Sequence, residues 1–562
     1  MVGLGAYQLS VDTKKTHRVS TSRHKCCLPI NYSFTENTGI ACRMKASSVK
    51  AFLSIHTWTG IGTGMVLFIA FYAGALTVFL HELETWDDYQ SDKVAVQHTL
   101  ADSQRLLDLA MANTPGMDDN LRLYPADTEH PTTSVIWYQR LEDRSFKRHD
   151  FNLDQNGGLS TAEHQHGELA KFIYRLHYTA GLPTSFGIYV LGIVSLIYGL
   201  ALVSGILIFL PNLMRDLFSL RSGKNKKRFW LDSHNAVGVI SLPWHLMFAW
   251  SSVLLCIGIF LIGPFQILVY EEDLLELIGP ELGVVQPLKA TGEAGKVMSL
   301  ASIISTAEDQ AEGFSPTQLR FSNYGDSNTM VQIFGNSNTE TLLTNVSITM
   351  NAVTGEVLSA SHPKNTGLGA TLYNGLIALH YVSFGGFFIK WIYFLLGLAG
   401  AFLFYSGNVL WIETRRKRRT LNQPTNTILL ARLNSGICLG CMAGISAAFL
   451  MSRGMVGMES RGEFTEWAYY LTFFASICWM FVRTVAAGTR DLLFSCALFT
   501  GLIPIFDASF AQTPIWQSFI DRNWPMFSVN LIALFGAYTF WKLALAVKQR
   551  AFNGDANSVW SL

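Results

Sequence analysis

Charged side chains are scarce in this 562-residue sequence, which contains only 15% Asp, Glu, Lys and Arg and has a net charge of +1. A nucleic-acid partner is therefore not expected, because binding one requires a strongly basic surface. Apolar residues make up 49% of the chain and aromatic residues 13%. This composition is typical of a protein embedded in a lipid membrane.

The cysteines give no sign of a disulfide framework, since none of the eight lies in a loop that we predict to be outside the cytoplasm. Cys438 and Cys441 form a CxxC motif inside an apolar run, where close packing of small residues explains them better than redox chemistry. The sequence also lacks a CxxCH motif for covalent haem attachment and a GxGxxG motif between a strand and a helix. No flavin or NAD domain is therefore expected in the chain.

Apolar runs of about 20 residues, the length needed to cross a bilayer, predict eight membrane-spanning helices. They lie near residues 51–80, 186–210, 236–263, 388–411, 429–450, 467–483, 489–506 and 527–547. Basic loops stay on the cytoplasmic side, and basic clusters at 215–230 and 413–420 follow the second and fourth spans. We therefore expect both termini in the cytoplasm and the two long loops outside it.

The expected fold is mainly α, a polytopic membrane protein with about eight transmembrane helices and two small α+β outer units. The expected segments are a polar N-terminal segment (1–47), the first span (48–81), an outer unit (82–185), two spans joined by a basic loop (186–263), a second outer unit (264–387), the fourth span (388–412), a basic cytoplasmic loop (413–428) and a four-helix extension (429–562). Residues 1–43 lack the apolar core of a signal peptide, and translation is expected to start at Met44.

The second long loop has the pattern of a small α+β unit. Residues 301–313 have helical periodicity, whereas residues 329–336 and 346–360 alternate like strands. Thr354-Gly355 is the expected turn between the last two strands.

The first long loop repeats this pattern. It offers a helix at 103–114 and strands at 133–140 and 146–161, with Asn156-Gly157 as a strong hairpin turn. The repetition indicates an internal duplication.

Two polar stretches beside the spans contain possible metal ligands. The sequence EHQHGE contains Glu163, His164, His166 and Glu168 as candidate metal ligands, and HELETWDD at 81–88 is a second acidic run. Solvated loop polarity is the favoured interpretation of both stretches.

Histidines are concentrated in the first half of the chain. Five of the fourteen lie at or inside the ends of the first four spans, and the last four spans contain none. These five are His56, His177, His234, His245 and His380. A lone histidine at a helix end is explained equally well by contacts with lipid headgroups, but ionisable groups in a bilayer are costly, and five together favour a function. The sequence thus separates a four-helix functional core from a four-helix extension.

The predicted topology sorts these histidines into two tiers. His56 and His234 lie near the cytoplasmic face, and His177 and His380 lie near the outer face. His245 follows His234 by eleven residues, which places it on the same face of an ideal helix about 16 Å further along.

Two tiers of imidazole suit b-type haem, which needs one or two axial imidazoles from facing helices and apolar walls. His234 and His245 are therefore interpreted as ligands, one in each tier. His56 is the first choice as partner of His234, while His177, His245 and His380 compete for two outer positions. Pro243 is expected to kink the helix and alter the relative phase of His234 and His245.

Other site chemistries fit less well. Zinc prefers a compact cluster of ligands, whereas these histidines are spread over four helices. A proton-coupled transporter usually adds membrane carboxylates, which are nearly absent from the spans. The small residues at 60–64 and 397–402 are explained either by helix packing or by a flat macrocycle.

Four segments resemble, in order, the PepSY-associated transmembrane family. They are SIHTWTGIGTGMVLFIAFYAGALTVF, LHYTAG, DSHNAVGVISLPWHLMFAWSS and LHYVSFGG. The two outer units look like PepSY folds, and the second ends in the similar MNAVTGEV. The resemblance covers about residues 45–412 and maps the haem histidines of the family onto the five histidines named above.

This resemblance implies an iron-regulated inner-membrane protein or ferric-siderophore reductase, with haem b, in two copies, as cofactor. Electrons would pass from a quinol or a cytoplasmic reductase to a ferric siderophore or other ferric chelate in the periplasm. Some relatives carry a reductase module after the core, whereas this chain has the four-helix extension, so the donor stays open. The alternatives are a PepSY-containing binding or regulatory protein and a transporter component for siderophore or metal.

Overall fold

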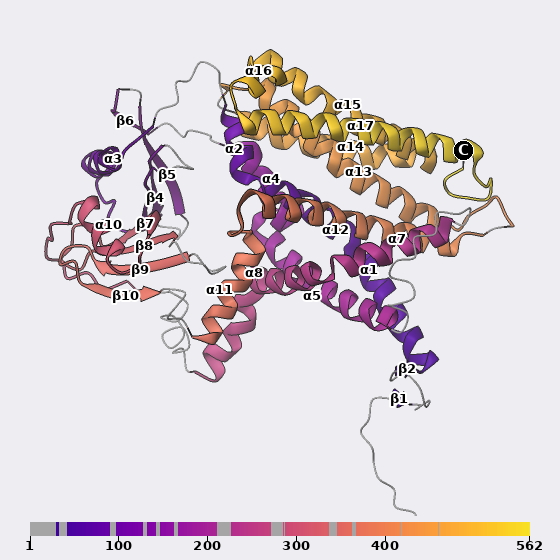
Figure 1. The fold of residues 1–562 in the computed structure, drawn as a ribbon, viewed down its shortest axis with the longest axis horizontal. Coiled ribbons are helices and arrows are strands. Elements are labelled where there is room, and N and C mark those ends of the chain that lie inside the picture. The colour runs from indigo at the N-terminus through magenta and orange to yellow at the C-terminus, as the bar shows by residue number, and fades with distance from the viewer. Residues whose placement is uncertain are drawn as a thin grey trace, which may run out of the picture.

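The computed structural model describes residues 30–32, 42–89, 97–126, 132–141, 146–154, 156–161, 167–210, 226–270, 285, 287–336, 345–361, 367–417, 419–458 and 460–561. A bundle of long helices makes up most of the molecule, and one β-sheet lies to its side (Figure 1). The mainly α fold predicted from composition is confirmed.

Seven helices in the described part of the chain are long and apolar enough to cross a membrane. They are α1 (Ala46–Thr77), α5 (Thr184–Phe209), α8 (Leu242–Leu268), α12 (Gly386–Arg415), α13 (Thr425–Gly454), α15 (Val485–Phe510) and α17 (Trp524–Asn553). The predicted span at 467–483 lies in α14 (Arg461–Val482), a helix that does not reach the required hydropathy because charged side chains occupy its first two turns. Seven of the eight predicted spans thus coincide with helices of this kind in the described residues, which agrees with the expected number of about eight.

The third predicted span is divided into two helices. Helix α7 (Lys226–Ile240) ends before Ser241, and α8 begins at Leu242 with Pro243 in its first turn. Proline fits this position because its missing N–H would have no partner in the helix. The expectation of one helix with a kink was thus incomplete, since His234 lies on α7 and His245 on α8.

The sheet consists of eight antiparallel strands in the order β10-β9-β8-β7-β3-β4-β5-β6. The first loop supplies α3 (Leu100–Asn113), β3 (Leu121–Tyr124), β4 (Ser134–Arg140), β5 (Phe146–Leu153) and β6 (Leu159–Ser160). The second supplies α10 (Leu300–Glu308), β7 (Ser315–Ser322), β8 (Met330–Asn336), β9 (Asn345–Asn351) and β10 (Val357–Ser361). Both predicted turns contain a glycine with positive φ, 72° at Gly157 and 77° at Gly355.

The two outer units are joined edge to edge into a single sheet. Strands β3 and β7, which the alternation pattern did not reveal, pair with each other and bring Leu121 opposite Phe321 and Leu123 opposite Leu319. All four side chains are fully buried in one core that also includes residues of α3 and α10. The two predicted units therefore share one continuous sheet and one core. Apart from this sheet, the short strands β1 (Ile30–Tyr32) and β2 (Cys42–Met44) pair with each other.

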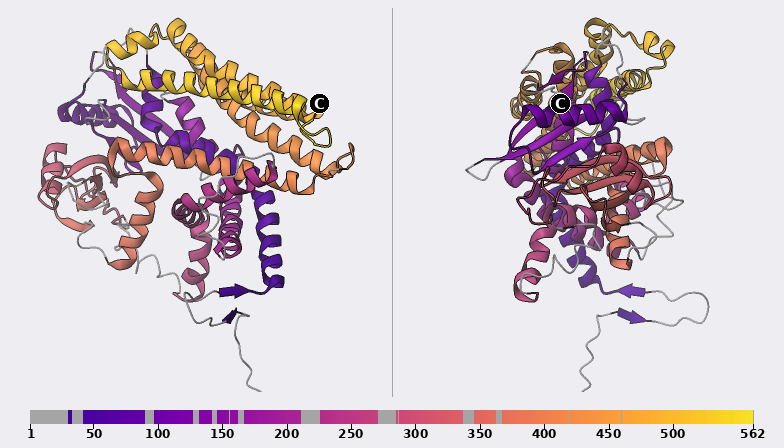
Figure 2. Two further views of the ribbon diagram at one scale, coloured as in Figure 1. Left: turned by 45° about the vertical axis from the view of Figure 1, so that its right-hand side comes forward. Right: turned by 90° about the vertical axis from the view of Figure 1, so that its left-hand side faces the viewer.

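The helices of the extension lie together on one side of the bundle, opposite α5 and α8 (Figure 2). A short helix, α16 (Ile515–Ile520), precedes α17. Helix α2 (Leu80–Asp88), which follows α1, contacts α17 and α4 (Glu168–Thr179). Trp86 and Asp87 of α2 are buried there, so the interpretation of HELETWDD as a solvated loop was wrong.

Candidate functional site

Four of the five candidate histidines form two facing pairs. In the first pair, the ring centres of His56 on α1 and His234 on α7 are 6.2 Å apart, with an angle of 74° between the ring planes. The Nδ1 atom of His56 lies 2.8 Å from the carbonyl oxygen of Ala201 on α5 and donates its proton there. The Nδ1 atom of His234 lies 3.2 Å from the hydroxyl of Ser406 on α12. Four helices thus position one pair.

The second pair lies on short helices that precede two of the spans. His177 on α4 and His380 on α11 (Leu368–Tyr381) have ring centres 6.1 Å apart. His177 Nδ1 donates to the carbonyl oxygen of Ala70, 2.8 Å away, and His380 Nδ1 lies 2.6 Å from the hydroxyl of Ser251. Burial lowers the pKa of both imidazoles. Both are therefore neutral at neutral pH, which is the form that binds a metal.

His245 belongs to neither pair. It is almost fully buried, with 1% of its surface exposed, and its Nδ1 atom is hydrogen-bonded to the hydroxyl of Tyr198 on α5. Its Nε2 atom has no partner among the described residues. Phe71 on α1 packs against this ring, with 5.6 Å between the ring centres. Of the three histidines considered for the two outer positions, the structure thus brings His177 and His380 together and places His245 apart from them.

Glycines lie against four of the five imidazoles. A Cβ atom at Gly74 would come within 2.6 Å of His177, and one at Gly205 within 3.0 Å of His56. At Gly407 and Gly400 the corresponding distances, to His234 and His245, are 3.2 Å. Each glycine therefore provides the space that lets a neighbouring helix approach an imidazole closely.

This arrangement leaves the Nε2 atom of each paired imidazole available, because Nδ1 is held by a hydrogen bond. Such a bond fixes the ring orientation and the tautomer of a metal-binding histidine. Two metal–nitrogen bonds of about 2 Å, plus about 1 Å from each nitrogen to its ring centre, separate two axial imidazoles by about 6 Å. The observed separations of 6.2 and 6.1 Å fit a single metal ion between the two rings of each pair.

No compact metal cluster of three or more His, Cys, Asp or Glu side chains occurs in the described part of the chain. The candidate ligands Glu163, His164 and His166 lie outside the described residues, whereas Glu168 begins α4 and lies 3.4 Å from Lys171 Nζ. Sequence reasoning brought His56 and His234 together but missed Tyr198, Ser251 and Ser406. The available signal was a polar side chain inside an apolar run, which needs a hydrogen-bond partner in a membrane.

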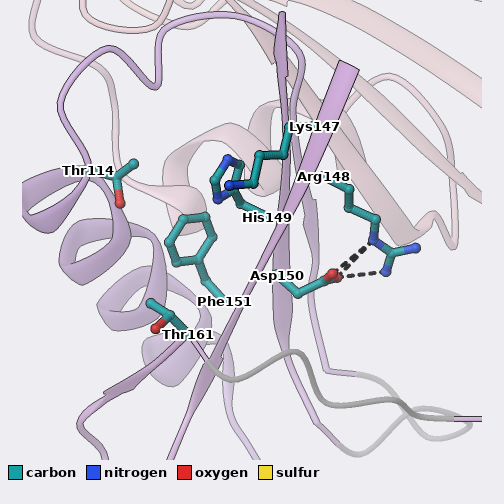
Figure 3. Close-up of a pocket in the computed structure, with 7 residues that line it drawn as sticks. All are labelled: Thr114, Lys147, Arg148, His149, Asp150, Phe151 and Thr161. Carbon is teal, nitrogen blue, oxygen red and sulfur yellow. Dashed lines mark hydrogen bonds and ion pairs between the residues drawn. The ribbon is translucent and has the colours of Figure 1, made fainter. Parts of the chain in front are cut away.

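A surface pocket on the sheet is lined by Thr114, Lys147, Arg148, His149, Asp150, Phe151 and Thr161 (Figure 3). All of these residues lie between the end of α3 and the residue that follows β6, so they belong to the first outer unit. Arg148 and Asp150 satisfy each other in this pocket through a bidentate contact, with 2.6 Å between Arg148 Nη2 and Asp150 Oδ1. None of the five candidate histidines lines this pocket.

A family model described as "PepSY-associated TM region" matches residues 53–414, which is more than half of the chain. The matched range runs from α1 almost to the end of α12 and includes all five candidate histidines. It ends before α13. No curated protein matches the sequence.

Proposed function

Because the chain belongs to the PepSY-associated TM region family, we propose that this multi-pass membrane protein binds haem b and reduces a ferric chelate across the membrane. The observation that carries the proposal is the presence of two facing imidazole pairs, 6.2 and 6.1 Å between ring centres, on different helices. Bis-imidazole ligation from facing helices is typical of non-covalent haem.

In this proposal His56 and His234 hold one haem, and His177 and His380 hold the other. A bound haem supplies a carrier that accepts and releases one electron at a time. Ala201, Ser406, Ala70 and Ser251 hold the Nδ1 atoms, so each imidazole keeps a fixed orientation with Nε2 free. The residues of the chain thus orient the ligands before the cofactor arrives.

Aromatic side chains fill the space that leads inward from His380. Phe248 lies 5.4 Å from His380 between ring centres, Phe71 lies 5.8 Å from Phe248, and His245 lies 5.6 Å from Phe71. Tyr198 closes the far side of His245. These rings keep water out of the membrane interior, which limits the reorganisation that accompanies any change of charge there.

The proposed location is the bacterial inner membrane, with both termini in the cytoplasm and the sheet in the periplasm. Basic residues at the end of α12, such as Arg415 and Arg416, support this orientation because basic residues stay on the cytoplasmic side. The proposed donor is a quinol or a cytoplasmic reductase. The proposed acceptor is a ferric siderophore or another ferric chelate, whose Fe(III) takes up one electron and becomes Fe(II).

Haem content tests the proposal directly. The protein purified in detergent should give a reduced-minus-oxidised spectrum of low-spin b-type haem, and pyridine haemochrome quantification should give about two haems per chain. His234→Ala should remove one spectral component and His380→Ala the other. His149→Ala is the matched control, because His149 lies on β5 and packs against Trp137.

Addition of a ferric chelate to the reduced protein should then restore the oxidised spectrum. A folded protein that binds no haem, or histidine variants that keep both haems, would overturn the proposal. A binding protein without redox activity is the second candidate, and the continuous sheet favours it, since α3 and α10 both pack on one face of the joined strands and leave the other to a partner. A folded, haem-free protein would support that candidate.

A further inference from the structure

Two arginines face each other where the two outer units join. Arg122 on β3 and Arg320 on β7 are directly paired across the antiparallel junction. Their neighbours Leu121, Leu123 and Leu319 point to the opposite face, into the core with α3 and α10. Because side chains alternate along a strand, both guanidinium groups lie on the face of the sheet that these helices leave uncovered.

Neither arginine has a carboxylate partner in the described part of the chain. The Nε atoms of Arg122 and Arg320 are both buried without a hydrogen-bond partner. The guanidinium groups instead lie over aromatic rings, 4.6 Å from the ring centre of Tyr138 for Arg122 and 5.2 Å from that of Phe334 for Arg320. Arg148 on the same face differs, because Asp150 neutralises it.

The rest of this face adds positive charge. Register places Arg122, Arg140, Arg148 and Arg320 on it, together with one carboxylate, Asp150, among the described strand residues. Burial, followed by the charge of Arg122, lowers the pKa of Arg320. Like charges directly opposite each other on paired strands are unfavourable. The fold therefore keeps a charge arrangement that costs stability, a pattern found at binding sites.

We propose that the junction of the two units is a docking site for an anionic ferric chelate with carboxylate or catecholate donors. This inference rests on the proposed function and adds to it the charge class and the binding surface of the substrate. Guanidinium forks bind carboxylate oxygens in a bidentate manner. Tyr138, together with Tyr124, whose hydroxyl accepts a hydrogen bond from Gln318, supplies aromatic surface beside the two charges.

The connectivity of the chain supports this assignment. The first half of the sheet leads into α4, which carries His177, and the second half leads into α11, which carries His380. The docking surface and this histidine pair therefore lie on the same side of the membrane. A chelate held at the junction is on the side where the proposed acceptor receives electrons.

Binding can be measured without reduction by using gallium(III) citrate, because gallium(III) has the charge and size of ferric iron but is not reduced in water. Isothermal titration of the purified full-length protein should detect gallium citrate. The double substitution Arg122→Gln with Arg320→Gln should weaken this binding at least 10-fold. Arg105→Gln is the matched control, since Arg105 is exposed on α3, beside Gly157 on the other face.

The unfolding temperature of the double variant provides a second measurement, because a purely structural role of the two arginines predicts a different result. Removing two unpaired like charges should leave the unfolding temperature unchanged or raise it, whereas loss of a structural contact would lower it. Unchanged gallium citrate affinity in the double variant would overturn the inference. The inference would also be overturned if the double variant lost more of its binding to anionic lipid vesicles than of its binding to gallium citrate. The occupant of the site would then be a lipid headgroup.

The haem measurement separates this inference from the proposed function. The double variant should retain the haem spectrum and haem content of the unmodified protein. A neutral gallium trihydroxamate should bind the unmodified protein and the double variant with equal affinity, because the proposed site selects negative charge. Gallium citrate binding by a haem-free protein would support the docking site while overturning the reductase.

Discussion

Arg453 and Asp507 form an ion pair that is fully buried, with 2.8 Å between Arg453 Nε and Asp507 Oδ1. The pair joins α13 to α15, and Trp86 of α2 contacts both of its side chains. The Trp86 indole donates to Asp507 Oδ2 over 2.8 Å, while the Arg453 guanidinium lies 4.1 Å above the indole ring centre. The extension is therefore bound to the chain segment that leaves the first span.

Removing one partner of this pair should destabilise the protein strongly. Arg453→Met leaves Asp507 buried and without its counter-charge, and the expected cost is about 3–5 kcal/mol. The double variant Arg453→Met with Asp507→Leu should recover much of this loss, because no unpaired charge then remains. Thermal unfolding in detergent, followed by tryptophan fluorescence, measures both effects.

An exposed pair serves as the control for this experiment. Arg483 and Asp491 lie 3.2 Å apart, and the arginine side chain is 42% exposed. Arg483→Gln should cost less than about 1 kcal/mol, because water and salt screen such a pair. Equal losses in Arg453→Met and Arg483→Gln would contradict the structural role of the buried pair.

Gly74→Ala should disturb the outer histidine pair. The new methyl group would lie 2.6 Å from His177 Nδ1, so the ring would have to move and lose its hydrogen bond with Ala70. Loss of such an orienting bond lowers metal affinity about 10–100-fold. Haem titration should reveal one weakened site and one unchanged site.

Gly62→Ala on the same helix is the control for this substitution. No atom lies within 4 Å of the position that its Cβ would take, and both haem sites should retain their affinity. Weakening of both sites in Gly74→Ala, or of neither, would contradict the assigned geometry.

Tyr198→Phe should destabilise the protein without loss of haem. The substitution removes the hydroxyl that bonds His245 Nδ1, and an unsatisfied buried polar group costs about 1–3 kcal/mol. Tyr189→Phe, on the same helix but 41% exposed, should have little effect. A fall in haem content in Tyr198→Phe comparable to that in His234→Ala would make His245 a ligand and disprove its separate placement.

Phe321→Ala should weaken both halves of the sheet. Phe321 lies opposite Leu121 across the junction, and both side chains are fully buried. A substitution of this kind costs about 3–5 kcal/mol. Hydrogen exchange should increase in β4 of the first unit as well as in β8 of the second. Increased exchange in the second unit alone would show that the two units are independently stable.

Much of the fold follows from local sequence patterns. Apolar run lengths located the spans, and alternation with Gly turns located β4, β5, β8, β9 and β10. The junction strands β3 and β7 were not predicted, because β3 has only four residues and because their pairing joins segments nearly two hundred residues apart. Long-range pairing of this kind depends on tertiary packing rather than local propensity.

The candidate site was predictable to a similar degree. Topology placed His56 beside His234, because both open outward-running helices on the same side. The separate position of His245 depends on the helix break at Ser241 and on Tyr198 from another helix, and neither can be read from spacing alone. HELETWDD was misinterpreted because its acidic residues suggested solvent, whereas Arg461, the partner of Asp87, and Arg453, which donates to the carbonyl oxygen of Trp86, lie more than three hundred residues later.

The joined sheet also sets an order of assembly. Strand β3 pairs on one side with β4 and on the other with β7, and β7 is synthesised only after α5, α7 and α8. Until that point the first half of the domain exposes an unpaired strand edge, the feature most prone to association with other chains. Pairing of β7 with β3 then covers this edge, so a first half produced without β7 would keep it exposed.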